Sequence, residues 1–234
     1  MNFLFKISTL IMKTAIEAMY SRRSIREFEN ERVPQDVIQE VIKAAGAAPS
    51  SKNTQPWLLY LVQGKALDAL KTDMLAAFDA GEKLHQDYPY SPNPMPDNWM
   101  SRARACGIDI FKLKGIDRED KEKRRLHDRE NFHFFGAQQV FFVGTNAKAY
   151  AYGTFMDCGF FMGNLMLSLD ALGYGSCPQY SAVGYPELLR KHIPNSQDTL
   201  FMAALPFGHA RKNSLVNTFQ PARLPVEEWF KTVE

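Results

Sequence analysis

Residues 21–28, with the sequence SRRSIREF, carry the side chains that best suggest a bound ligand. Three arginines and two serine hydroxyls fall within six consecutive residues of this stretch. A guanidinium is planar and permanently charged, and it can donate two hydrogen bonds at once to phosphate oxygens. On an extended backbone Arg22, Ser24 and Arg26 share one face, with Arg23 and Ile25 on the other. The pattern predicts a site for an anion, with a solvated basic surface as the alternative.

The composition limits what such a site can serve. The chain has 234 residues, 45% of them hydrophobic, which is enough for one large domain with an extensive core. Its 28 basic and 26 acidic residues nearly cancel. A general nucleic-acid binder would carry a marked basic excess. The positive charge is therefore local, and no nucleic-acid partner is expected.

The cysteines and histidines favour neither a disulfide framework nor a metal centre. Cys106, Cys158 and Cys177 are widely spaced and form no CxxC pair. The five histidines show no HExxH or similar ligand spacing. Cysteine usage of this kind is natural in a reducing compartment, so we expect a cytoplasmic protein without a metal site.

The first residues need a separate interpretation. Residues 1–12, MNFLFKISTLIM, are apolar, but a membrane-spanning helix needs about 20 apolar residues. They also lack the basic region and the small-residue cleavage site of a secretory signal. We expect residues 1–13 to be an N-terminal extension that packs on the body or on a partner subunit, with no role in a membrane. Met12 is an alternative start.

The elements that must position the arginines indicate a sheet with helices. Short apolar runs predict buried strands, and apolar residues at helical spacing predict helices between them. Strands alternating with helices favour an α/β or α+β sandwich over a helical bundle. The strands are expected at residues 57–62, 140–144 and 200–205, and the helices at residues 34–48, 66–83, 99–114, 118–131, 154–172 and 186–192, with the end of a first helix at residues 14–19.

Residues 85–135 differ in character from the segments around them. Four of the 13 prolines lie at residues 88–96, and a dense run of charges, most simply a solvated helix face, follows at residues 117–129. An excursion of this length between two strands is usually an active-site lid or a subunit-contact arm. Its aromatic residues are candidates for a substrate pocket. These are Tyr88, Tyr90, Trp99 and Phe111.

Familiar loop motifs do not explain how a cofactor could be held. The sequence has no GxGxxG, no Walker loop and no nucleophile elbow. A second cationic stretch, GHARK, lies at residues 208–212, far from the first in sequence. If a phosphorylated cofactor binds, side-chain cations rather than a Gly-rich loop are expected to hold its phosphate.

Three separated pieces together resemble the nitroreductase family of FMN flavoproteins. They are RRSIR at residues 22–26, APSSKNTQPW at residues 48–57 and GHAR at residues 208–211. Their order and spacing, with the apolar segment 154–172 and the loop GYGSCPQ between them, make the resemblance specific. It covers roughly residues 14–84 and 136–230, and the long 85–135 segment is the part that varies within the family.

The resemblance implies an α+β fold with a mainly antiparallel central sheet flanked by helices, built as an intertwined homodimer. Residues 14–234 would form a single FMN-binding domain with two FMN sites per dimer. Residues 85–135 would be an inserted lid or substrate region. The tail at residues 213–234 would be an extended arm that embraces the partner.

The resemblance also implies roles for individual residues. An N-terminal group and a late arginine would hold the FMN phosphate and ribityl chain, a loop of the other subunit would line the isoalloxazine, and a third group would lie along the ring edge. The first group is Arg22, Arg23, Ser24, Arg26 and Arg211, the second is Pro49, Ser50 and Ser51, and the third is Asn53 and Gln55 near the pyrimidine edge with Cys177, Pro178 and Gln179 against the ring. Cys177 is expected to be a small buried residue and not a nucleophile.

The implied activity is an FMN-dependent transfer of a hydride from NAD(P)H, through flavin N5, to a small nitroaromatic or quinone-like acceptor. The chemistry would belong to the flavin, so no protein residue is expected to be catalytic. The same FMN cradle could serve reductive dehalogenation, flavin fragmentation or ene reduction, or a non-catalytic flavin-binding protein. The sequence does not choose between NADH and NADPH.

Overall fold

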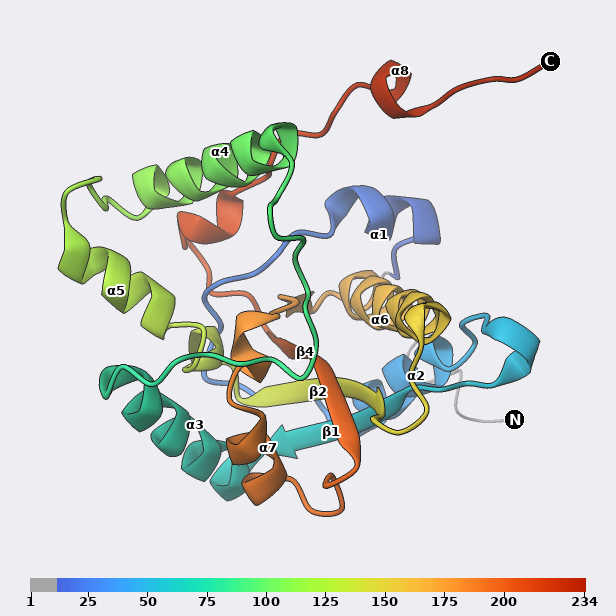
Figure 1. The fold of residues 1–234 in the computed structure, drawn as a ribbon, viewed down its shortest axis with the longest axis horizontal. Coiled ribbons are helices and arrows are strands. Elements are labelled where there is room, and N and C mark those ends of the chain that lie inside the picture. Colours follow the sequence, from blue (N-terminus) through green and yellow to red (C-terminus); the bar gives the residue numbers. More distant parts are fainter. Residues whose placement is uncertain (1–11) are drawn as a thin grey trace.

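The computed structural model describes residues 12–234, whose centre is a four-stranded antiparallel sheet (Figure 1). The strand order is β1-β2-β4-β3. In the central pair Phe142 of β2 lies opposite Ala204 of β4. The predicted α+β class with an antiparallel sheet is confirmed. The strands are β1 (Leu58–Gln63), β2 (Gln139–Asn146), β3 (Gly175–Ser176) and β4 (Thr199–Gly208).

Helices cover both faces of the sheet because successive apolar side chains of the central strands point to opposite faces. Val140 and Phe142 pack with helices α3 (Gly64–Asp79) and α7 (Pro186–His192). Phe141 and Val143 face the opposite way, toward α2 (Gln35–Ala45) and α6 (Tyr152–Ala171). The sheet therefore lies between two helical layers, each with its own hydrophobic core.

Helix α6 is the long apolar helix that the sequence predicts, and it packs beside α2 and α1 (Figure 1). Its inner face is buried through Phe161, Leu165 and Leu169. Its outer face leaves Met156 63% exposed. Within residues 12–234 no helix has both the length and the apolar character needed to cross a membrane.

Helix α1 (Ala15–Ser21) begins where the sequence suggested that a first helix ends, so that prediction is wrong. Thr14 is the N-cap: its hydroxyl accepts from Glu17 N, and the Glu17 carboxylate accepts from Thr14 N. Lys13 forms an ion pair with Asp170 of α6 at 2.8 Å. Most of the predicted extension at residues 1–13 lies outside the described residues.

The insertion between α3 and β2 holds two helices, α4 (Asp97–Leu113) and α5 (Lys121–Arg129), at one side of the sheet (Figure 1). Helix α5 is tied to α3 because Arg125 and Arg129 bind Asp79 at 2.9 and 2.7 Å. Helix α4 packs on the tail that follows β4. The tail carries the short turn η4 (Val216–Thr218) and ends in α8 (Val226–Trp229), which projects from the body (Figure 1).

The sheet departs from the prediction at both edges. The segment at residues 57–62 was expected to be buried on both faces, but β1 is an edge strand and Leu58 is 38% exposed. At the other edge, β3 forms within a segment that was expected to be only a loop. Both differences come from strand pairing, which a local apolar pattern does not encode.

Candidate functional site

The arginine segment, residues 21–28, is extended because its backbone pairs with the edge of the sheet. Ser24 pairs in parallel with Ser176 of β3, and Phe28 forms a bridge with Ala210. Ile25 is buried against Gly175, where an added Cβ would lie 2.5 Å from Ile25 Cγ1. A glycine at residue 175 therefore allows the segment to approach β3 closely enough to pair.

Four arginines line one cavity of about 210 Å³, which we call the arginine cavity. Three belong to the segment itself, and Arg223 comes from the tail. Arg23 shares this cavity with Arg22 and Arg26, so the predicted alternation of faces does not hold for it. The described residues that line the cavity include no aspartate or glutamate. They are Met19, Tyr20, Arg22, Arg23, Ser24, Arg26, Cys106, Phe219, Gln220, Pro221 and Arg223.

Three buried side-chain polar atoms, one of them on an arginine that lines the cavity, lack partners within residues 12–234. They are Arg22 Nη1, Ser176 Oγ and Gln179 Oε1. A buried polar group without a hydrogen bond costs about 1–3 kcal/mol, and such groups are rare in folded proteins. Four arginines with one unsatisfied buried N–H donor, that of Arg22, fit a phosphorylated ligand such as the FMN that the resemblance implies.

The segment that follows β3 runs from the arginine cavity toward a second pocket. Cys177 is buried beside Ser24 and Arg26, and burial raises the pKa of its thiol, which therefore stays protonated near neutral pH. Gln179 exchanges backbone hydrogen bonds with Ala204 of β4 at 2.8 and 2.9 Å. Its Nε2 donates to Asn131 Oδ1 at 3.1 Å. Asn131 lies in no motif and was therefore not predicted from the sequence.

The second pocket, about 330 Å³, is lined mainly by aromatic and sulfur-containing side chains, and we call it the aromatic pocket. Tyr88 and Tyr90 enter it from the insertion and Tyr180 from the segment after β3. Tyr90 and Tyr180 stack at 5.8 Å with 9° between their planes. The Tyr88 hydroxyl donates to Met202 O at 2.5 Å, and burial raises its pKa. The aromatic and sulfur-containing lining offers an apolar surface on which a planar aromatic ligand can pack.

The other two aromatic candidates of the insertion do not line the aromatic pocket. Trp99, on α4, is half exposed and does not line this pocket. Phe111 meets His127 edge to face at 5.2 Å and lies under the Arg124 guanidinium. Their role in a substrate pocket is therefore not supported within one chain.

The loop at residues 49–56 is exposed and lines neither cavity. Ser51 N donates to both carboxylate oxygens of Asp157, at 3.3 and 3.2 Å, and Asp157 is only 6% exposed. Gln55 N donates to Ser50 Oγ at 3.0 Å. These contacts hold a strained backbone, since Lys52 has a φ of 51°. The roles implied for Pro49, Ser50, Ser51, Asn53 and Gln55 need a second subunit and stay predictions.

Arg211 lies outside the arginine cavity. Its backbone N donates to Glu27 O at 2.9 Å, and its guanidinium contacts Phe28 O at 3.5 Å. Arg223 lines the cavity instead. Arg223 could not be predicted from periodicity, because it stands in an irregular tail between Pro221 and Pro225.

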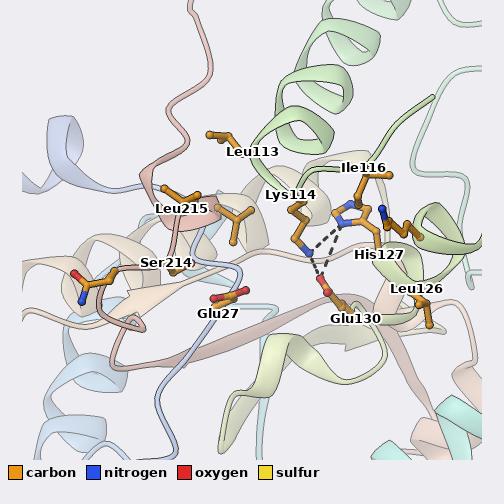
Figure 2. Close-up of a pocket in the computed structure, with 12 residues that line it drawn as sticks. Glu27, Leu113, Lys114, Ile116, Leu126, His127, Glu130, Ser214 and Leu215 are labelled. Atoms are coloured by element: carbon orange, nitrogen blue, oxygen red, sulfur yellow. Dashed lines mark hydrogen bonds and ion pairs between the residues drawn. The ribbon is translucent and has the colours of Figure 1, made fainter. Parts of the chain in front are cut away.

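A neighbouring pocket of about 440 Å³ shows why the arginine cavity is the better anion site (Figure 2). In it the Lys114 ammonium donates to the Glu130 carboxylate and lies 3.3 Å from His127 Nδ1. Glu27 adds a second carboxylate. Burial, helped by the positive charges of Lys114 and Arg26, lowers the pKa of His127 to about 4. The lysine charge is already matched, and the histidine is neutral.

Comparison with known proteins agrees with the resemblance found in the sequence. The Nitroreductase family model matches residues 19–209. The chain is 30% identical over 220 residues to Nitroreductase NfnB of Mycolicibacterium smegmatis, covering 93% of this chain and 92% of the relative. It is 29% identical to Chloronitrobenzene nitroreductase of Comamonas testosteroni, covering 89% and 92%.

Solved structures and a more distant group of relatives extend the comparison. The structure of FMN and NADPH-dependent nitroreductase NfnB from Sphigopyxis sp. strain HMH has a TM-score of 0.90 at 28% identity and covers 95% of this chain and 100% of that chain. Iodotyrosine deiodinase of Hydra vulgaris is 31% identical over 119 residues, covering 48% of this chain and 44% of the relative. Because the family model matches most of this chain, and because the fold agrees, this chain belongs to the nitroreductase family.

Proposed function

We propose that this chain is an FMN-dependent oxidoreductase that transfers reducing equivalents from NAD(P)H to a small nitroaromatic or quinone-like acceptor. The observation that carries the proposal is the arginine cavity, which four arginines line and where the buried Nη1 of one of them, Arg22, has no partner among residues 12–234. The relative from Sphigopyxis is described as FMN and NADPH-dependent, which supports the same cofactors here.

The chain's own residues would bind and orient the flavin. Arg22, Arg23 and Arg26 would hold the phosphate, with Ser24 at its side. We propose Arg223 rather than Arg211 as the late arginine, because Arg223 lines the cavity. When bound, the flavin would supply the hydride-accepting and hydride-donating chemistry.

The segment after β3 would position the ring end. The pairing of Gln179 with Ala204 and Asn131 would fix the backbone at residues 177–179 beside the ring. Cys177 and Pro178 would pack there, and the neutral thiol would add no charge. Tyr88, Tyr90 and Tyr180 would exclude water from the aromatic pocket and stack a planar acceptor or the nicotinamide.

We further propose that the functional unit is a homodimer. Helices α1 and α6 pack side by side, and α1 leaves Ile16 and Met19 mostly exposed while α6 does the same with Met156. A second copy would cover this apolar surface. It would also bring the loop at residues 49–56 to the partner's flavin, with the tail at residues 213–234 reaching across.

The test is spectroscopic and uses the full chain. We expect a yellow protein that bleaches anaerobically with NADH or NADPH and regains its colour when a nitroarene or a quinone is added. A protein that stays colourless after incubation with FMN contradicts the proposal. Bleaching without reoxidation by either class of acceptor rejects the acceptor assignment but keeps the flavoprotein.

Arg223 and Arg211 give a matched pair of variants. Arg223→Ala should weaken FMN binding by about 1.5–3 kcal/mol, the scale of a lost hydrogen bond to a charged group. Arg211→Ala should change the affinity by less than about 0.5 kcal/mol, as expected of a surface substitution. Isothermal titration of apo-protein with FMN measures both, and the reverse ranking would reinstate Arg211 as the late arginine.

Reductive dehalogenation is the second candidate. It is favoured by the similarity to iodotyrosine deiodinase and by the aromatic pocket, which suits a halogenated phenol as well as a nitroarene. Halide release from iodophenols by the reduced protein, faster than nitroarene reduction, would make it the leading activity.

A further inference from the structure

Asn217, in the η4 turn of the tail, binds the backbone of the arginine segment with both ends of its side-chain amide. Asn217 Oδ1 accepts from Arg26 N at 2.8 Å and from Glu27 N at 3.2 Å. Asn217 Nδ2 donates to Glu27 O at 2.8 Å. Asn217 is only 9% exposed. One buried amide thus acts on the segment as a neighbouring strand would.

These hydrogen bonds act on the part of the segment that carries Arg26. Sheet bridges hold the segment at Ser24 and again at Phe28. Between those two points Asn217 takes both backbone N–H groups, at Arg26 and Glu27. The Arg26 guanidinium is itself tied to Ser24 O at 3.2 Å. The direction in which Arg26 enters the cavity therefore depends on where Asn217 holds its peptide.

Helix α4 holds Asn217 in place from behind. Val216 and Phe219, on either side of Asn217, are buried against Ile110 of α4. The Phe219 ring also lies 6.0 Å from the Arg26 guanidinium, within the range of a cation–π contact. The chain of contacts runs from the insertion, through the tail turn, to the arginine that faces the cavity.

We propose that Asn217 is a positioning residue for the phosphate end of the site, and that α4 supports the site through it. The proposal rests on the proposed function, since the anion to be held is the FMN phosphate. It divides the insertion at residues 85–135 into two parts. Tyr88 and Tyr90 line the aromatic pocket, whereas α4 serves the phosphate end and does not select the acceptor.

The test compares FMN with riboflavin, which has the same ring and ribityl chain without the phosphate. Dissociation constants are measured by quenching of flavin fluorescence with full-length apo-protein. Asn217→Ala should weaken FMN binding about tenfold, as expected for about 1.4 kcal/mol, and riboflavin binding less than about twofold. Ile110→Ala, which loosens the packing of α4 against the tail, should lower the preference for FMN over riboflavin by a smaller factor.

A matched asparagine serves as the control. Asn146 Oδ1 accepts from Lys148 N at 2.8 Å at the exposed end of β2, and Asn146 lines neither cavity, so Asn146→Ala should leave both dissociation constants unchanged. If Asn217→Ala does not fold, Asn217→Ser, whose hydroxyl can restore only part of the contacts, should show the same loss of preference with a smaller factor.

The outcomes separate the inference from the function beneath it. An equal loss for FMN and riboflavin, or unchanged FMN binding by a folded Asn217 variant, overturns the positioning role while the proposed function stands. A wild-type protein that binds neither flavin overturns the proposed function, and the positioning role with it.

Discussion

Replacing Arg22 with methionine should change ligand binding and the stability of the apo-protein in opposite directions. Arg22 Nη1 is buried without a partner among the described residues, and leaving such a donor unsatisfied costs about 1–3 kcal/mol. Methionine has a similar length and no polar group to desolvate. The free energy of unfolding of the apo-protein should therefore rise by about 1–3 kcal/mol in Arg22→Met.

The same substitution should weaken FMN binding. A hydrogen bond to a charged group contributes about 1.5–3 kcal/mol, which corresponds to a roughly 10- to 150-fold larger Kd. A ligand that binds only the native state stabilises it by RT ln(1 + [L]/Kd), so the gain in Tm on adding FMN should shrink in the variant. The variant should thus be more stable than wild type without FMN and should gain less from FMN.

The assay is denaturant unfolding of apo-protein with and without FMN, with isothermal titration for the Kd. Arg118→Met, at an exposed arginine outside the cavity, is the control and should change neither quantity by more than about 0.5 kcal/mol. An Arg22→Met protein that is less stable than wild type without FMN and binds FMN normally would refute the reasoning, since the guanidinium would then be a structural group.

Two further predictions concern the supports of the site. Because the folded state lowers the pKa of His127 from about 6.5 to about 4, folding disfavours its protonation, so stability is complete above pH 6.5 and falls by up to about 3 kcal/mol as the pH drops toward 4. His127→Gln should remove most of this fall in urea unfolding at about pH 7 and pH 4.5, and an unchanged slope would contradict it. Asp157→Ala removes a charged acceptor of Ser51 N, so trypsin should cleave after the exposed Lys52 about tenfold faster under native conditions; an unchanged rate would show that other contacts hold the loop.

The sequence predicted those parts of the fold that depend on local pattern. The apolar runs in β2 and β4 and the helical spacing in α2 and α6 each identify an element that packs on the core, so their existence follows from residue order. The start of α1 was misplaced although Thr14 and Glu17 form a capping box, which is a signal that the sequence does contain. Strand β3 was missed because two residues paired across the sheet carry no periodicity.

The candidate site divides in the same way. The arginine segment was predictable because its residue types alone imply an anion, and the structure brings its arginines to one cavity. Arg223 and Asn217 were not predictable, since each lies in an irregular tail and acquires its role by tertiary contact with residues about 190 positions earlier. Residue chemistry identified the ligand's charge, and only the fold identified what holds the arginines in place.

The arginine cavity places unfavourable electrostatics where a ligand can relieve them. Four like charges around about 210 Å³ repel one another, and one buried donor has no partner in the described chain. Such an arrangement persists only if the surrounding structure fixes it, which the Ser24 and Phe28 bridges and the Asn217 hydrogen bonds do. Binding a phosphate dianion would then cost little reorganisation, because the donors are already held in position. The contacts that hold the arginine segment therefore determine the affinity for the ligand as much as the arginines do. Loosening these contacts should weaken ligand binding even though every positive charge remains.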